Sequence, residues 1–363
     1  MIKFLRTAST RRLLAGALGV VLAGVIATAV AMAAVGGGAV PPAASLASAL
    51  HAAAEGQSVN GITANVTFTN NLFSGGSVET VDPLLTGASG RLWASGGDLR
   101  LELQSDNGDA QLVVNGRSFW ISDPMSQTVY EGTLPARRSV AGTGTNPTAP
   151  MPTHETSTIA QIQDRLDRLS RHADVSAATP TNIGGEPAYD VEVTPKDNSS
   201  LIGAVRVGFD ADHAIPLDLA VFPAGGNAPA LELAASNVSY GPVASSVFDI
   251  SPPAGSRVVH VAMPAPDATS STGDVNVVGS GASSVIVVKE PVASGSSGDA
   301  VGTGSGHTGP LPVRNVSIDG TSGQELPTSL GTVLQFTRDG VSYLLAGSVT
   351  PSTIASIAAS LPR

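Results

Sequence analysis

The feature that most constrains the fold is a series of closely spaced turn signals between residues 90 and 135. Three dipeptides there have the composition of two-residue hairpin turns: Gly96-Gly97, Asn107-Gly108 and Asn115-Gly116. Between them, apolar and polar residues alternate with the period of two that is typical of a strand with one dry face and one wet face. The segment therefore predicts a continuous antiparallel meander.

Each two-residue turn fixes which residues lie opposite one another, so the three turns test each other's registers. Gly96-Gly97 places Leu92 opposite Leu101, Asn107-Gly108 places Leu103 opposite Leu112, and Asn115-Gly116 places Leu112 opposite Phe119. All three registers place the same apolar residues on one face of the sheet. The predicted dry face consists of Leu92, Ala94, Leu99, Leu101, Leu103, Ala110, Leu112, Val114, Phe119 and Ile121.

Both tryptophans of the chain fall on the opposite face. Trp93 is predicted to lie opposite Arg100, as a cation–π pair. Trp120 has the same orientation two strands further on. The two indoles are therefore excluded from the dry face, and they form a candidate docking site on the outer surface.

Composition excludes several classes of function. The 363 residues contain no cysteine, which rules out disulfides, thiolate nucleophiles and Cys-ligated metal centres. The net charge is −10, and the basic residues form no cluster beyond the N-terminus, so nucleic acid is not an expected partner. The apolar fraction of 42% is sufficient for the cores of two domains.

No motif for catalysis stands out. The sequence has no Gly-x-Ser-x-Gly elbow, no His-x-x-x-His or His-Glu-x-x-His pair, and six histidines without pattern. The Gly-rich run at residues 302–306 lacks the lysine of a phosphate-binding loop, and its composition indicates a linker. We therefore predict a protein that is not an enzyme and that has no cofactor and no metal site.

The N-terminus predicts export. Four basic residues precede an uncharged run from Leu13 to Ala34, and Ala31-Met32-Ala33 fits a signal-peptide cleavage site. The run is also long enough for an uncleaved membrane helix with its N-terminus on the cytoplasmic side. Residues 1–35 are therefore either a signal peptide or an N-terminal membrane anchor. In both cases the remaining chain is extracytoplasmic, secreted or anchored to the membrane.

The rest of the chain divides into three parts. Residues 43–260 carry the meander, further strands and two helices, which begin at Ser45 and Thr158. Residues 261–310 are a Pro/Gly/Ser-rich linker with one strand. Residues 311–363 combine a hairpin turn at Asp339-Gly340 with a terminal helix, and form a small α+β module. The fold class is α+β, a curved antiparallel sheet covered by helices.

The strands of the meander also resemble a known family. The runs Gly90-Arg91-Leu92-Trp93, Leu99-Arg100-Leu101-Glu102, Asn115 to Trp120 and Val129-Tyr130 resemble the LolA-like superfamily. This superfamily includes periplasmic lipoprotein carriers, RseB/MucB-like regulators of anti-sigma factors and mycobacterial lipid-carrier lipoproteins. The resemblance covers residues 43–260 and implies an incomplete β-barrel closed by helices around an apolar cavity.

Three further points belong to this resemblance. The C-terminal module looks like the smaller domain that follows this fold in the anti-sigma regulators. The Ala- and Gly-rich composition is similar to that of actinobacteria. The chain lacks the lipobox cysteine of the mycobacterial lipoproteins, so the N-terminal helix is the expected attachment.

The dry face predicts where a ligand would bind. With few aromatic residues to fill the space, a broad Leu-rich sheet can leave a cavity, and acyl chains would gain about 0.8 kcal/mol per buried methylene. The expected function is a cell-envelope carrier or chaperone for lipid or lipoprotein acyl chains. The predicted cavity lining is Leu92, Leu99, Leu101, Leu103, Leu112, Val114, Phe119 and Ile121.

Two alternatives stay open. The chain could be a non-enzymatic envelope sensor that binds the extracytoplasmic domain of an anti-sigma factor or another membrane protein. Alternatively, helices at residues 43–56 and 157–173 could fill the concavity, so that no ligand binds.

Overall fold

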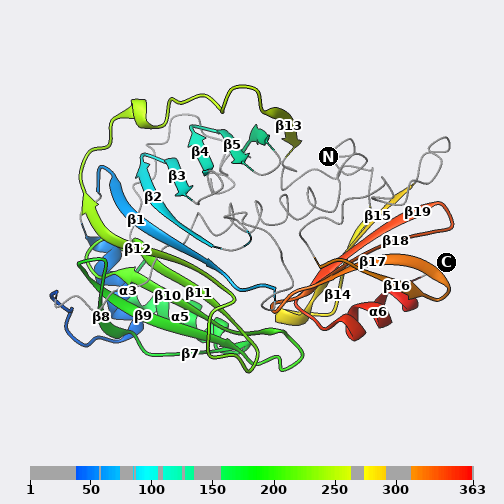
Figure 1. Cartoon of the computed structure of the whole chain (residues 1–363). Helices are drawn as coiled ribbons and strands as arrows, with labels where there is room; N and C mark the ends of the chain where they lie inside the picture. Colours follow the sequence, from blue (N-terminus) through cyan, green and yellow to red (C-terminus); the bar gives the residue numbers. More distant parts are fainter. Residues whose placement is uncertain are drawn as a thin grey trace, which may run out of the picture.

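The computed structural model describes residues 38–56, 59–73, 85, 87–104, 109–124, 127–134, 157–262, 274–291 and 312–361. Within them the chain forms two β-sheets that lie side by side, a large curved one and a smaller one (Figure 1). The predicted fold class, α+β with an open curved sheet, is confirmed. The predicted segment at residues 1–35 lies outside the described residues.

The large sheet has thirteen strands. Twelve of them lie in the order β13-β6-β5-β4-β3-β2-β1-β12-β11-β10-β9-β7, and β8 pairs with β9. All its pairs are antiparallel except β13 with β6, which is parallel. The strands are β1 (Ile62–Asn70), β2 (Ala88–Ser95), β3 (Asp98–Gln104), β4 (Ala110–Asn115), β5 (Ser118–Asp123), β6 (Thr128–Thr133), β7 (Ala173–Val175), β8 (Thr179–Ile183), β9 (Glu186–Pro195), β10 (Ile202–Asp210), β11 (Pro216–Pro223), β12 (Leu231–Tyr240) and β13 (Arg257–Ala262).

The small sheet is antiparallel and has six strands in the order β14-β15-β19-β18-β17-β16. Helix α6 (Pro351–Ser360) packs on one face of it, and Ile354 and Ala358 of this helix are fully buried in the core of this sheet. The predicted strand of the linker is β15, which pairs with both β14 and β19. The strands are β14 (Asp274–Val278), β15 (Val285–Pro291), β16 (Arg314–Ile318), β17 (Thr321–Pro327), β18 (Thr332–Arg338) and β19 (Val341–Gly347).

The meander has the predicted faces, although two of its three predicted registers are wrong. Leu92 lies opposite Leu101, as Gly96-Gly97 requires, and both glycines have positive φ. Leu112, however, lies opposite Leu101 on one side and Ile121 on the other, instead of Leu103 and Phe119. Each register differs from the prediction by two residues. Because side chains alternate with a period of two, such a shift keeps every residue on its predicted face.

The turn between β4 and β5 explains one of these errors. Gly116 and Arg117 are the central residues, and Asn115 pairs with Ser118. Gly116 has a φ of 60°, and type II′ turns place a glycine with positive φ at this first central position. The Asn115-Gly116 dipeptide therefore begins one residue before the turn. The other predicted turn, Asn107-Gly108, lies outside the described residues.

Both predicted helices of the large domain begin where their capping residues indicated. Ser45 caps α3 (Leu46–Glu55), and its side chain accepts a hydrogen bond from the Ser48 amide. Thr158 caps α5 (Ile159–Leu169) and forms a complete capping box with Gln161. Two 3₁₀ turns, at Ser245–Val247 and Gly281–Ser283, complete the described helical elements.

Hydrogen bonds between loops join the two sheets. The Leu201 amide donates to the Ser348 carbonyl at 2.8 Å, and the Ser329 amide donates to the Leu72 carbonyl at 2.8 Å. Asp197 accepts a hydrogen bond from the Ser283 amide at 3.1 Å. The buried hydrophobic clusters of the described residues are separate for the two sheets, so this joint is polar.

A segment at residues 241–256, here called the crossing segment, connects β12 to β13 over the outer face of the meander (Figure 1). Its carbonyls accept hydrogen bonds from three successive strands. Arg100 of β3 donates to Val247, Asn115 of β4 to Phe248, and Trp120 of β5 to Ile250.

A candidate ligand-binding face on the large sheet

The large sheet presents one face that has no charged side chain across its central rows. The pairings align Ala64, Leu92, Leu101, Leu112, Ile121, Tyr130 and Val259 in one row across seven strands. A second row on the same face contains Phe68, Leu233, Leu219, Val207 and Val191. Together the rows span eleven strands, from β13 to β9. We call this surface the apolar face.

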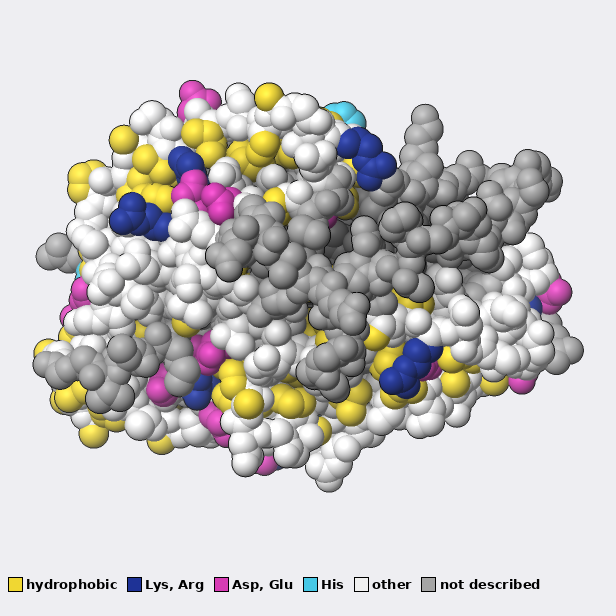
Figure 2. Space-filling model, in the orientation of Figure 1, with side chains coloured by type: hydrophobic (Ala, Val, Ile, Leu, Met, Phe, Trp, Pro, Cys, Tyr) yellow, Lys and Arg dark blue, Asp and Glu magenta, His cyan; other side chains and the backbone are white. Residues whose placement is uncertain are grey.

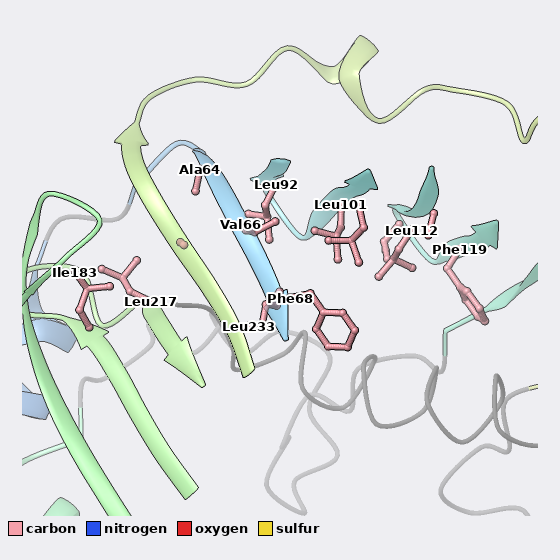
Figure 3. Packing of buried hydrophobic residues seen from close by; sticks show 14 of the residues in the cluster. Ala64, Val66, Phe68, Leu92, Leu101, Leu112, Phe119, Ile183, Leu217 and Leu233 are labelled. Carbon is pink, nitrogen blue, oxygen red and sulfur yellow. The ribbon is translucent and has the colours of Figure 1, made fainter. Parts of the chain in front are cut away.

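The predicted cavity residues come together on this face. All eight belong to one hydrophobic cluster. Leu92, Leu101, Leu103, Leu112, Val114 and Phe119 are buried, whereas Leu99 and Ile121 are partly buried. In Figure 3 the labelled side chains from β1 to β5 project to the same side of the sheet. Their predicted shared position is therefore confirmed, while their role in ligand binding stays a prediction.

Sequence reasoning missed half of this face. Val66 and Phe68 of β1 and Leu233 and Ala235 of β12 belong to the same cluster as the meander leucines. Their alternation was visible in the sequence as two separate strands. The pairing of β1 with β12 joins residues more than 160 positions apart, as in Ile62 opposite Tyr240, and no turn signal indicates such a pair.

The helices cover only one end of the apolar face. Helix α3 packs against Tyr189, Val191 and Phe209, at the β9–β10 end. Helix α5 lies against α3, with the His51 ring nitrogen 3.1 Å from the Ser157 carbonyl, and buries none of its own residues. Among the described residues, no helix contributes to the cluster that contains the meander leucines. The helices described here therefore do not fill the concavity over β2–β5.

The opposite face carries the charges. One of its rows runs through Trp93, Arg100, Val113, Trp120 and Glu131. The predicted cation–π pair is confirmed, because the Arg100 guanidinium carbon lies 5.3 Å from the centre of the Trp93 ring. Figure 2 shows charged side chains of both signs in small groups, with no broad basic patch on the visible surface.

The predicted docking role of the tryptophan pair does not hold for Trp120. Its side chain is buried beside Val113 and Val129, and Ile250 of the crossing segment packs against this cluster. The indole N–H donates to the Ile250 carbonyl at 3.3 Å. The outer surface of β5 is thus occupied by the chain itself, and a hydrogen-bonded indole is the usual state of a buried tryptophan.

Among the described histidines, His213 makes the most polar contacts, and its role is structural. The buried Asp210 carboxylate accepts hydrogen bonds from the His213 amide at 2.7 Å and from the Tyr240 hydroxyl at 2.6 Å. The His213 ring nitrogen lies 2.9 Å from the same carboxylate. Burial and the bond to Asp210 raise the pKa of Tyr240. Asp210 thereby fixes the turn after β10 to the end of β12.

The described residues contain no group of three or more metal-ligating side chains that could hold an ion. Within the same part of the chain, no helix is sufficiently long and apolar to cross a membrane.

The structure thus combines a curved open sheet that has two uncharged rows on one face with a second, smaller sheet. Comparison with solved structures finds several similar chains, at low identity and low TM-score. The MucA/MucB complex of Pseudomonas aeruginosa is similar at 16% identity and a TM-score of 0.42, over 86% of this chain and 94% of that chain. A LolA superfamily protein from Nitrosomonas europaea is similar at 10% identity and a TM-score of 0.18, over 86% of this chain and 97% of that chain.

A lipoprotein-sorting protein domain of the outer membrane, described as putative, from Vibrio parahaemolyticus is also similar, at 11% identity and a TM-score of 0.19. It matches over 82% of this chain and 87% of that chain. No protein-family model matches the sequence, and no curated protein matches it. The resemblance to LolA-like and MucB structures is therefore found at the level of structure. At these identities and TM-scores it assigns no ligand or partner to this chain.

Proposed function

We propose that this chain is a binding protein of the cell envelope that holds lipid or lipoprotein acyl chains on the apolar face. The observation that supports the proposal is the absence of charge along two rows that together span eleven strands. A buried charge or headgroup would have no partner there, whereas an alkyl chain gains about 0.8 kcal/mol for each methylene removed from water.

The distribution of helices supports the same proposal. Helix α3 covers the β9–β10 end of the face, and the described helices leave the β2–β5 end uncovered. Leu99 and Ile121, at this end, are only partly buried. An elongated apolar ligand would therefore lie along β2–β5 and contact Leu101 and Leu112 at the middle of the row.

The test is to purify the full chain from membranes and to identify bound lipid in solvent extracts by mass spectrometry. Uptake of a fluorescent fatty acid would be measured in parallel. Ile121→Glu places a charge on the apolar face at a partly buried position and should abolish uptake. Ser118→Glu adds the same charge to an exposed position of the same strand, on the other face, and should bind normally. Absence of lipid and of uptake in the unmodified chain would exclude the proposal.

The alternative is an envelope sensor for the extracytoplasmic domain of an anti-sigma factor or another membrane protein. One observation favours it: Val277 and Ile286 lie opposite each other on the small sheet and are 62% and 48% exposed. Contiguous exposed apolar patches mark sites of protein interaction, and these two side chains would contribute to such a patch. Ile286→Arg should abolish capture of a partner protein and leave fatty-acid uptake unchanged. If Ile286→Arg captures the same partner as the unmodified chain, this alternative loses its support.

A further inference from the structure

The strands that carry helix α3 hold a group of buried charges on their other face. Arg206 of β10 lies between two carboxylates: its Nε is 3.3 Å from Asp218 Oδ2 of β11, and its Nη2 is 3.1 Å from Glu232 Oε1 of β12. Asp190 of β9 lies opposite Gly208, the residue two positions after Arg206. Three carboxylates therefore surround one guanidinium.

Two oxygens of this group have no hydrogen-bond donor. Asp218 Oδ1 and Asp190 Oδ1 are both buried and unpartnered, and the Asp218 side chain is only 2% exposed. A buried carboxylate oxygen without a donor is costly, whereas a protonated carboxyl can donate to a neighbouring carboxylate.

Gly208 brings these two side chains together. A Cβ at this position would lie 2.7 Å from the Asp218 Cβ and 2.9 Å from Asp190 Oδ1. The third close atom is the Ile183 Cδ1, at 2.3 Å, so an aliphatic side chain closes this space. The Asp190 and Asp218 side chains thus both border the space above Gly208, together with Ile183, and a larger residue at position 208 would displace them.

We propose that Asp190 and Asp218 share one proton at neutral pH, and that loss of this proton loosens the strands that carry helix α3. Two carboxylates in one dry site cannot both ionise without strong repulsion, and sharing a proton supplies the missing donor for both unpartnered oxygens. The site is a protonation switch within the fold, on the face of β9 to β11 opposite to helix α3.

The electrostatics agree with this arrangement. Burial, with smaller contributions from Asp190 and Glu232, raises the pKa of Asp218 to about 7 against the opposing effect of Arg206. Burial also raises the pKa of Asp190.

The described neighbours add one more charge. Glu192 of β9 lies directly opposite Arg206 and is exposed. Thr179 of β8, which pairs with Asp190, and Thr69 of β1, which pairs with Glu232, are neutral. Arg206 is therefore the one cation among the described neighbours.

The coupling to α3 follows from strand alternation. Tyr189 and Val191 flank Asp190 in β9, and their side chains point away from it, to the cluster that holds α3. A second negative charge at Asp190 and Asp218 would push β9 and β11 apart. The same displacement would move the platform under α3.

The direction of the pKa shift determines whether the fold becomes more or less stable as the pH rises. A carboxyl with a raised pKa in the folded state binds its proton more tightly than in the unfolded chain. Its stabilising effect is complete below the unfolded pKa and is lost as the pH rises through 7. From this group alone, the unfolding constant should rise about tenfold between pH 6 and pH 8.

Urea unfolding of the full chain at pH 6 and pH 8 tests the proposal. Asp218→Asn mimics the protonated side chain and should remove this tenfold rise, whereas Glu192→Gln, at the exposed carboxylate, should retain it. Hydrogen exchange of the α3 amides, corrected for intrinsic rates, should accelerate at pH 8 in the unmodified chain and not in Asp218→Asn. If the unfolding constant of Asp218→Asn keeps the same pH dependence as the unmodified chain, the proposed switch is wrong. If exchange of the α3 amides in the unmodified chain does not accelerate at pH 8, the proposed coupling to α3 is wrong.

A measurement on the unmodified chain covers the case in which Asp218→Asn does not fold. Infrared spectroscopy should show the carbonyl band of a buried protonated carboxyl at pH 6, and this band should disappear above pH 8. Its absence at pH 6 would contradict the shared proton.

Discussion

Truncation of Leu101 distinguishes a ligand-binding face from a closed core. Leu101 lies at the middle of the apolar row, opposite Leu92 and Leu112, and is 4% exposed. Leu→Ala removes three carbons, and their transfer from water is worth about 2 kcal/mol. In a fully packed core, the cavity that remains adds to this cost and the total reaches about 3 to 5 kcal/mol. If ligand space already adjoins Leu101, we expect a loss of about 2 kcal/mol.

Leu334→Ala is the matched control. Leu334 is fully buried in the core of the small sheet, beside Phe336, Leu345 and Ile354, and should show the full cost of about 4 kcal/mol. Both tryptophans lie in the large sheet, so their fluorescence follows its unfolding in urea, and hydrogen exchange follows the small sheet.

Fatty-acid binding should discriminate further between the two interpretations. Leu101→Ala should bind the probe at least as well as the unmodified chain, because it enlarges the space, whereas Leu101→Glu should not bind it. The argument for an open apolar face would be refuted if Leu101→Ala and Leu334→Ala lose the same free energy of unfolding and neither variant takes up the fatty acid.

Three other changes test particular contacts. Thr158→Ala removes one half of the capping box and should cost helix α5 about 1 kcal/mol, measured as faster amide exchange limited to residues 159–169. Gly208→Ala introduces a Cβ 2.3 Å from the Ile183 Cδ1 and should destabilise the large sheet by about 1 to 3 kcal/mol in urea unfolding. Hydrogen bonds from Ser199 and Ser283 lower the pKa of Asp197 to about 2, so its contribution to the joint is present above the ordinary pKa and is lost as the pH falls toward 2. Asp197→Ala should therefore expose the amides of residues 281–284 at neutral pH and remove the acid dependence of their exchange.

The faces of the meander could be predicted from the sequence because alternation and turn composition are local properties. The exact partners could not, since an Asn-Gly pair can occupy the turn or begin one residue before it, as it does at Gly116. The face assignment survived because both errors were shifts of two residues. A shift of one would have moved Leu101 and Leu112 to the outer face.

Long-range pairings were the part that sequence reasoning could not supply. The pairing of β1 with β12 doubles the apolar face, and no short-range sequence pattern predicts this pairing. Strands β14 and β15 occur in a Pro-, Gly- and Ser-rich region whose composition indicated a linker, yet they pair within the small sheet. Trp120 looked like a surface residue because its cover comes from the crossing segment, more than 120 positions later.

The crossing segment also makes the outer surface of the large sheet depend on a distant part of the chain. Strand β13 pairs with β6, with Arg257 opposite Thr128, and the residues that lead to it accept hydrogen bonds from β3, β4 and β5. A growing chain therefore leaves the outer face of β3, β4 and β5 without this cover until the crossing segment has been synthesised, and such non-local closure is slow. Because the Trp120 indole donates to the Ile250 carbonyl, its fluorescence should report the time at which the crossing segment covers the meander during folding.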